Sequence, residues 1–132
     1  MPGLTVTGHA DAPVEDVWKL LFDPSRFPEW WDGFDTVRPD GPGAFTWWPT
    51  GHPDYPMPQR MHTDEAGGRV TISCQVRDVS FVWRLAADGE GTAVEVRAEL
   101  AASEAHREAG VRAMLATSMR SLTVLATDTA QK

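Results

Sequence analysis

The segment from Ala12 to Val37 constrains the fold most, because it encodes a short helix followed directly by a dense cluster of aromatic residues. Pro13 suits the first turn of a helix, where the N–H that proline lacks would have no partner. Pro24 ends this helix, since the residue before a proline avoids helical backbone angles. A second short helix is predicted over residues 25–31. The apolar face of the first helix repeats at i, i+3, i+4 and i+7 and consists of Val14, Val17, Trp18 and Leu21.

Strands and glycine-rich turns account for most of the remaining chain. A strand is predicted over residues 4–9, before the helices, and several more between about residues 35 and 101. The turns at 41–43, 67–68 and 88–91 predict antiparallel hairpins. Alternation is clearest in the last strand, where every second residue is apolar and one face is therefore buried: Val94, Val96, Ala98 and Leu100.

A long helix is predicted at the end of the chain, over Glu104–Asp128, with Ser103 as its N-cap. Its residues at helical spacing form one face that we expect to close onto the sheet. That face consists of Val111, Met114, Leu115, Ser118, Leu122 and Leu125.

Composition narrows the class of partner. The chain of 132 residues has the length of one domain, and its net charge is −7. Nucleic acids and anionic membrane surfaces favour clustered Lys and Arg, so neither is expected as a partner. The single cysteine cannot form an internal disulfide, and the start of the chain has no signal-peptide pattern. We therefore expect a soluble, cytoplasmic protein. The four histidines lack metal-ligand spacing, and no metal site is predicted.

Arg60 and His62 are the candidate reactive groups, on a predicted strand whose orientation the sequence leaves open. If both point inward, they bring a cation and a titratable imidazole to an apolar cavity, where they could stabilise an enolate and move a proton. If Gln59, Met61 and Thr63 point inward instead, the charged residues form a solvated strand face. Charged runs more commonly adopt the second arrangement.

The segment from Phe45 to Met61 is rich in both tryptophan and proline, and the prolines interrupt a regular hairpin ladder. It could form a stiff rim in which Trp47 or Trp48 stacks on a planar ligand together with Tyr55. It could equally be an irregular connection whose tryptophans complete the core. Successive side chains of a strand point to opposite faces, so only one of the two tryptophans can line a cavity.

The order of these features resembles the START-like, or Bet v 1-like (SRPBCC), superfamily, whose bacterial members include polyketide cyclase/dehydrase and lipid-transport proteins. The resemblance rests on the opening AP-x-E-x-VW-x-LL-x-D, the aromatic cluster before the second strand, Gly91-Thr92 at the start of the last strand, and the long final helix. It implies an α+β helix-grip fold over residues 1–132, in which a curved antiparallel sheet wraps around the C-terminal helix. Two short helices after the first strand and an internal hydrophobic cavity belong to the same fold.

The resemblance also implies function. As a cyclase/aromatase (dehydratase) without a cofactor, the protein would use Arg60 to stabilise an enolate oxygen and His62 to shuttle the proton, and an acyl carrier protein could deliver the polyketide-like substrate. The expected substrate contacts are Trp31, Phe34, Trp48, Tyr55, Phe81, Trp83, Met114 and Ser118.

Two other hypotheses use the same fold. Related cyclases carry an arginine where this chain has His62, and often a tyrosine where it has Phe34, so the more apolar cavity also suits a non-catalytic carrier or sensor of a lipid or aromatic metabolite. A protein-interaction module would instead have a filled core and an exposed apolar patch on the Trp47–Tyr55 segment.

Overall fold

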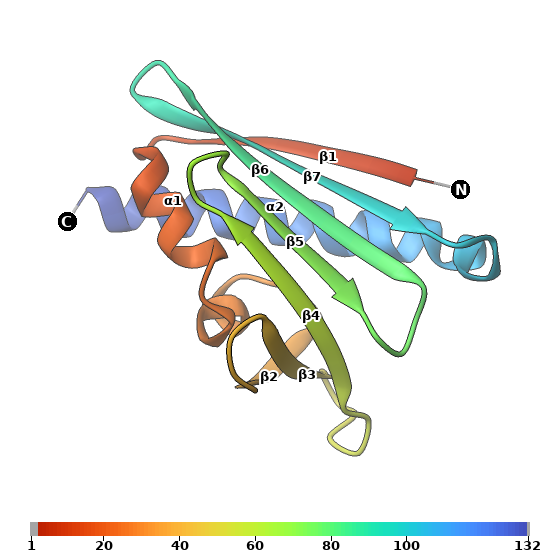
Figure 1. Ribbon diagram of the computed structural model, residues 1–132. Helices are drawn as coiled ribbons and strands as arrows, with labels where there is room; N and C mark the ends of the chain where they lie inside the picture. Colours follow the sequence, from red (N-terminus) through yellow and green to blue (C-terminus); the bar gives the residue numbers. More distant parts are fainter. Residues whose placement is uncertain (1–2, 132) are drawn as a thin grey trace.

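The computed structural model describes residues 3–131, which form one curved, seven-stranded antiparallel sheet with a long helix across its concave face (Figure 1). The sheet order is β1-β7-β6-β5-β4-β3-β2, so β1 pairs with the last strand and the other strands follow as hairpins. This arrangement confirms the predicted α+β helix-grip fold. The strands are β1 (Gly3–Ala10), β2 (Phe34–Pro39), β3 (Ala44–Pro49), β4 (Met57–Asp64), β5 (Arg69–Cys74), β6 (Val79–Asp88) and β7 (Gly91–Leu100); the helices are α1 (Val14–Leu21), η1 (Pro24–Glu29), η2 (Ala102–Arg107) and α2 (Glu108–Ala130).

The two predicted helices after β1 are present, but only the first is α-helical. Pro13 keeps an extended backbone, and its carbonyl accepts hydrogen bonds from the N–H groups of Asp16 and Val17 at 3.0 and 3.4 Å, which starts α1 as predicted. The second helix, η1, is a 3-10 helix. Asp23 caps it, because Oδ1 accepts from the Ser25 N–H at 3.0 Å. The short helix fixes the direction in which the following aromatic residues enter the core.

The C-terminal helix begins later than the sequence predicted. Residues 102–107 form the 3-10 helix η2, and α2 starts at Glu108 with Arg107, not Ser103, at the N-cap position. Over one turn, 3-10 and α-helical spacing are similar, so periodicity does not separate them. The predicted apolar face of α2 is confirmed: Leu115, Ser118 and Leu122 are buried, and Val111, Met114 and Leu125 pack partly buried against the core.

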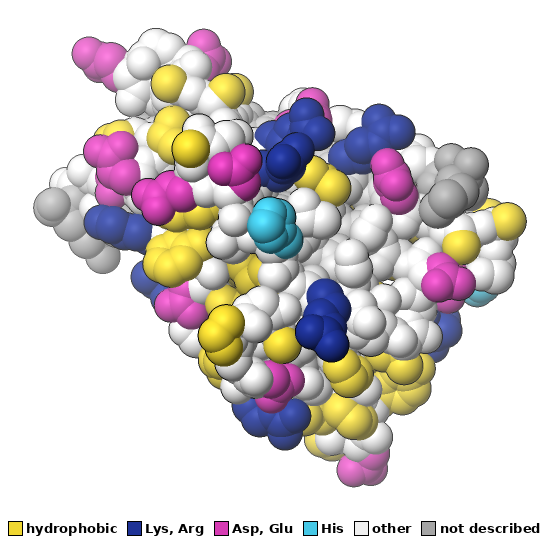
Figure 2. Space-filling model, viewed as in Figure 1, with side chains coloured by type: hydrophobic (Ala, Val, Ile, Leu, Met, Phe, Trp, Pro, Cys, Tyr) yellow, Lys and Arg dark blue, Asp and Glu magenta, His cyan; other side chains and the backbone are white. Residues whose placement is uncertain are grey.

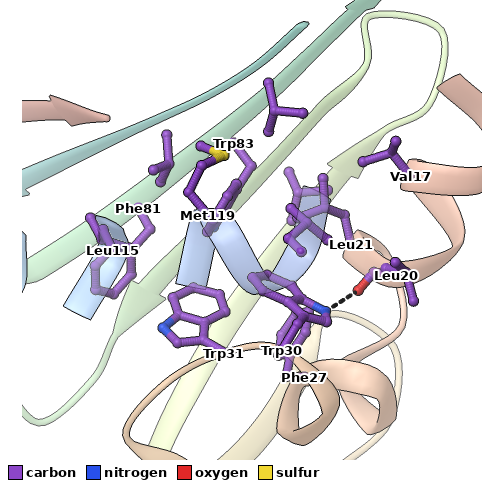
Figure 3. Close-up of a cluster of buried hydrophobic side chains, with 14 of the residues drawn as sticks. Val17, Leu20, Leu21, Phe27, Trp30, Trp31, Phe81, Trp83, Leu115 and Met119 are labelled. Atoms are coloured by element: carbon purple, nitrogen blue, oxygen red, sulfur yellow. Dashed lines mark hydrogen bonds between the residues drawn. The ribbon is translucent and has the colours of Figure 1, made fainter. Parts of the chain in front are cut away.

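Five aromatic residues, here called the aromatic plug, fill the middle of the space between sheet and helix. They are Phe27, Trp30, Trp31, Trp47 and Trp83, all nearly fully buried. The ring centroids of Trp31 and Trp47 lie 4.8 Å apart, and those of Trp30 and Trp83 5.2 Å apart, both edge to face. Trp30 Nε1 also donates to the Leu20 carbonyl at 3.0 Å (Figure 3). The plug occupies the part of the grip in which an internal cavity was expected.

Gly8 allows α2 to approach β1 closely. A Cβ at this position would lie 2.7 Å from Cγ and 2.8 Å from Sδ of Met119, closer than real Cβ contacts. Gly8 pairs with Val94 and therefore lies on the concave face, beneath α2. The sheet and the long helix thus meet where the strand has no side chain.

We expect Gly8→Ala to lower the free energy of unfolding by about 1–3 kcal/mol, because the added methyl group overpacks the contact with Met119. Urea denaturation measures this change. Gly3→Ala in the same strand is the matched control, since its Cβ would meet its nearest atom at 3.5 Å, and it should shift stability by less than about 0.5 kcal/mol. Equal effects of the two substitutions would contradict the close approach.

Asp40 closes the hairpin between β2 and β3. Its Oδ2 accepts from the Thr46 hydroxyl at 2.6 Å, and its Oδ1 accepts from Arg38 Nε at 2.7 Å. The hydrogen bond from Thr46, and secondly that from Arg38, hold the pKa of the Asp40 carboxyl below its usual value. The charged carboxylate therefore stabilises the folded hairpin.

This lowered pKa predicts a pH dependence for Asp40→Asn. A carboxyl whose pKa is lower in the folded state stabilises it above the unfolded pKa of about 4, and this contribution disappears as the pH falls through the folded value. Wild type should therefore melt at a higher temperature than the variant at pH 7, and the difference should shrink below about pH 4. A difference in Tm that stays constant down to pH 2 would contradict this account.

Candidate functional site

A pocket of about 620 Å³ lies beside the aromatic plug, between the concave face of the sheet and the first turns of α2. Cys74, at the end of β5, and Val79, at the start of β6, both line it, so it lies at the end of the sheet where β5 ends and β6 begins. Its volume is in the range of small-molecule sites. The predicted hydrophobic cavity is therefore present, but it is displaced toward one end of the grip. Its apolar floor and walls include Phe34, Trp47, Met57, Val79, Phe81 and Met114.

Two stacked rings form one wall of this pocket. Phe34 and Trp47 lie with ring centroids 3.8 Å apart and an interplanar angle of 11°. The strand register shifts between Phe34 and Thr36, a bulge that places both Phe34 and Val37 against the core although they are three residues apart. Without the bulge, strict alternation would turn one of these two side chains outward. The bulge thus creates the flat aromatic wall.

The mouth of the pocket is polar. Arg77 Nη2 donates to the Tyr55 hydroxyl at 3.2 Å, and the Arg77 guanidinium carbon lies 5.9 Å from the centroid of the Tyr55 ring. Glu104 lies between two arginines, with Oε1 3.8 Å from Arg77 Nη1 and Oε2 3.2 Å from Arg107 Nε. His52 and His106 also line this part of the pocket. The deep part is therefore apolar, and the basic and hydroxyl groups gather at the entrance.

The structure contradicts the inward orientation of Arg60 and His62. Both side chains are exposed on the outer face of the sheet, which carries charged residues of both signs (Figure 2). The register explains this: Gln59 pairs with Phe45 and Cys74, which places Gln59 and Met61 on the concave face. Their neighbours in the strand must then point away from the pocket. The predicted inward orientation of Arg60 and His62 is therefore wrong, and neither residue lines the pocket. The structure has the alternative arrangement, in which both residues lie on a solvated strand face.

The expected ligand contacts separate into three groups. Phe34, Tyr55, Phe81 and Met114 line the pocket. Trp31 and Trp83 belong to the aromatic plug, and Ser118 is buried, where its hydroxyl donates to the Met114 carbonyl at 2.8 Å and accepts from the Asp32 N–H at 2.9 Å. Trp48 faces outward and lies under Arg38, at 5.5 Å from its guanidinium carbon. The inward tryptophan of the pair is Trp47, which is 1% exposed.

Sequence reasoning missed the basic residues at the mouth. Arg77 lies in the turn between β5 and β6, and Arg107 lies at the junction of η2 and α2, so no local periodicity connects them. The signal that could have found them is topological. In a sheet gripping a C-terminal helix, the turn before β6 and the segment after β7 meet at the same end of the sheet. His52, which precedes Tyr55 in the proline-rich segment, also lines the pocket.

Residues 3–131 contain no group of three or more His, Cys, Asp or Glu side chains that could hold a metal ion. Among the same residues, no helix has the length and apolar character needed to span a membrane.

Solved structures share this fold at low sequence identity. A Nitrosomonas europaea protein is 19% identical, with a TM-score of 0.78 over 98% of this chain and 97% of that one. The Zhui aromatase/cyclase from a Streptomyces species is 17% identical, with a TM-score of 0.77 over 95% and 93% of the two chains. The di-domain aromatase/cyclase StfQ from the steffimycin biosynthetic pathway is 20% identical, with a TM-score of 0.67 over 97% of this chain and 44% of that one. These similarities establish the fold.

Sequence comparison identifies the family. No functionally curated protein matches the chain. A family model described as polyketide cyclase / dehydrase and lipid transport matches residues 1–127. Because this match covers almost the whole chain, the protein belongs to the polyketide cyclase/dehydrase and lipid transport family.

Proposed function

We propose that the protein binds a small, flat hydrophobic molecule in the pocket beside the aromatic plug. The stacked pair of Phe34 and Trp47 carries this proposal, because it presents a rigid aromatic wall to a pocket of about 620 Å³. A planar ring that lies along such a wall gains both apolar burial and aromatic contact. The family description and the fold are consistent with a ligand of this kind.

The arrangement supports binding of a small molecule better than binding of a protein partner. An interaction module would require an exposed apolar patch on residues 47–55, but Trp47 is turned inward and is 1% exposed. Tyr55, which is 41% exposed, accepts a hydrogen bond from Arg77 at the mouth of the pocket. Trp47 and Tyr55 therefore contribute to the pocket and its entrance.

Gly110 and Cys74 provide the test of this binding site. Both line the pocket, a Cβ at Gly110 would meet nothing within 4 Å, and Cys74 is the single cysteine of the chain. We use anthracene-2-carboxamide as a neutral, planar probe. It should quench tryptophan fluorescence on binding and slow the alkylation of Cys74 by N-ethylmaleimide.

We expect Gly110→Leu to weaken binding of this probe by roughly tenfold or more, because the new side chain projects into the pocket and takes up space that the probe needs. Leucine favours the helix more than glycine, so the variant should remain folded. Gly110→Ala is the control, since one methyl group leaves most of the volume free and should change the Kd only slightly. Binding that leaves Cys74 alkylation unchanged, or that Gly110→Leu does not weaken, would contradict this location.

The contact between Tyr55 and Arg77 favours a second candidate function, cyclisation of a polyketide-like substrate in the same pocket. Their 3.2 Å hydrogen bond places a phenol and a cation at the edge of an apolar space, where they could stabilise a developing enolate oxygen. This pair takes the role that the sequence resemblance gave to Arg60 and His62. An acyl carrier protein would have to present its acyl chain through the mouth beside Tyr55.

Cyclisation predicts a change in products when the protein is added to a reconstituted aromatic polyketide synthase, measured by chromatography and mass spectrometry. Tyr55→Phe should reduce the new product by at least about tenfold, because a donor to the enolate oxygen is lost. The double variant Arg60→Gln/His62→Gln is the control and should retain full activity, since both residues lie on the outer face. An unchanged product pattern with wild type would leave ligand binding as the function.

A further inference from the structure

The charged side chains that line the pocket mouth are basic. Among the described residues, the pocket is lined by Arg77, Arg107, His52 and His106, and by no aspartate or glutamate. The chain as a whole has a net charge of −7. The pocket is therefore lined by basic groups although the protein as a whole is acidic.

Glu104 balances only part of this charge. Its side chain is 10% exposed and lies behind the mouth, between Arg77 and Arg107. One carboxylate facing two guanidinium groups leaves one positive charge in excess among these three side chains. The excess charge lies where the apolar pocket opens to solvent.

Arg107 has the donors that a ligand could use. It contacts Glu104 through Nε at 3.2 Å, and its two Nη atoms donate no hydrogen bond to the residues between 3 and 131. Its side chain is 42% exposed, so the guanidinium is accessible from the pocket mouth. Arg77, in contrast, already donates to Tyr55 and contacts Glu104. Arg107 is thus the principal free anion-binding group of the pocket.

We propose that the natural ligand is a hydrophobic carboxylate, with its flat apolar body along Phe34 and Trp47 and its carboxylate at Arg107. This inference rests on the proposed binding function and names the class of ligand. Guanidinium and carboxylate groups match in shape and can form two parallel charged hydrogen bonds. The single excess positive charge corresponds to a monoanion. The apolar floor, in turn, requires the charge to lie at one end of the molecule.

A pair of probes with the same ring tests this inference. Anthracene-2-carboxylate and anthracene-2-carboxamide differ in charge but share the flat body, and isothermal titration calorimetry gives the Kd of each. Wild type should bind the carboxylate about tenfold more tightly, the scale of a charge-assisted hydrogen bond. Arg107→Gln should abolish this preference, because the carboxylate loses a charged partner whereas the carboxamide loses at most a neutral hydrogen bond. A circular dichroism spectrum identical to that of wild type shows that the variant is folded.

Arg112→Gln is the matched control. Arg112 lies in the first turns of α2, 4.0 Å from Glu108, and does not line the pocket, so its loss changes the net charge equally and should keep the tenfold preference. Equal binding of both probes by wild type, or a preference that survives Arg107→Gln, would overturn this inference while the proposed binding function stands. Failure of both probes to bind would overturn the two proposals together.

Discussion

The structure depends on how the aromatic residues of the segment after α1 pack into the concave face of the sheet. Trp30 and Trp31 contact Trp83, and Trp31 also meets Trp47 edge to face at 4.8 Å. Each such pair contributes about 0.5–1.5 kcal/mol beyond the burial of its area. The buried indole N–H groups of Trp31 and Trp83 find no acceptor among residues 3–131, so ring packing holds these two side chains in place. Because the plug fills the middle of the grip, the pocket of about 620 Å³ lies beside it, under the first turns of α2.

The apolar and polar groups of the site lie in different parts of the pocket. The plug and the Phe34–Trp47 stack give the pocket a dry, flat interior, whereas the groups that can donate protons or carry charge come from turns and helix junctions at its entrance. Electrostatic interactions at such an edge are stronger than in open water, because apolar walls lie on one side. The site is therefore suited to a molecule with a flat apolar body and one polar end, whether the protein carries that molecule or converts it.

The sequence predicted those features that depend on local patterns. The proline at position 13 and the apolar spacing after it located α1, and alternation in β7 identified its buried face. The charge pattern alone favoured the exposed orientation of Arg60 and His62 that the structure shows, whereas the family resemblance led to the inward one. Local pattern could not decide between them, because a shift of one residue in register exchanges the two faces of β4, and the prolines before β4 interrupt the alternation that would reveal the register. The bulge after Phe34 and the meeting of Arg77 with Arg107 depend on tertiary contacts, which no local period encodes.

The most direct test of the account is ¹⁹F NMR of protein labelled with 5-fluorotryptophan, titrated with a flat aromatic ligand such as anthracene-2-carboxylate. The chain contains six tryptophans, and single Trp→Phe variants assign the resonances of Trp47, in the pocket wall, and Trp48, on the outer face. The account predicts that the ligand shifts the Trp47 resonance most and leaves that of Trp48 unchanged. A titration that shifts Trp48 while Trp47 stays in place would contradict it, because the ligand would then bind outside the pocket.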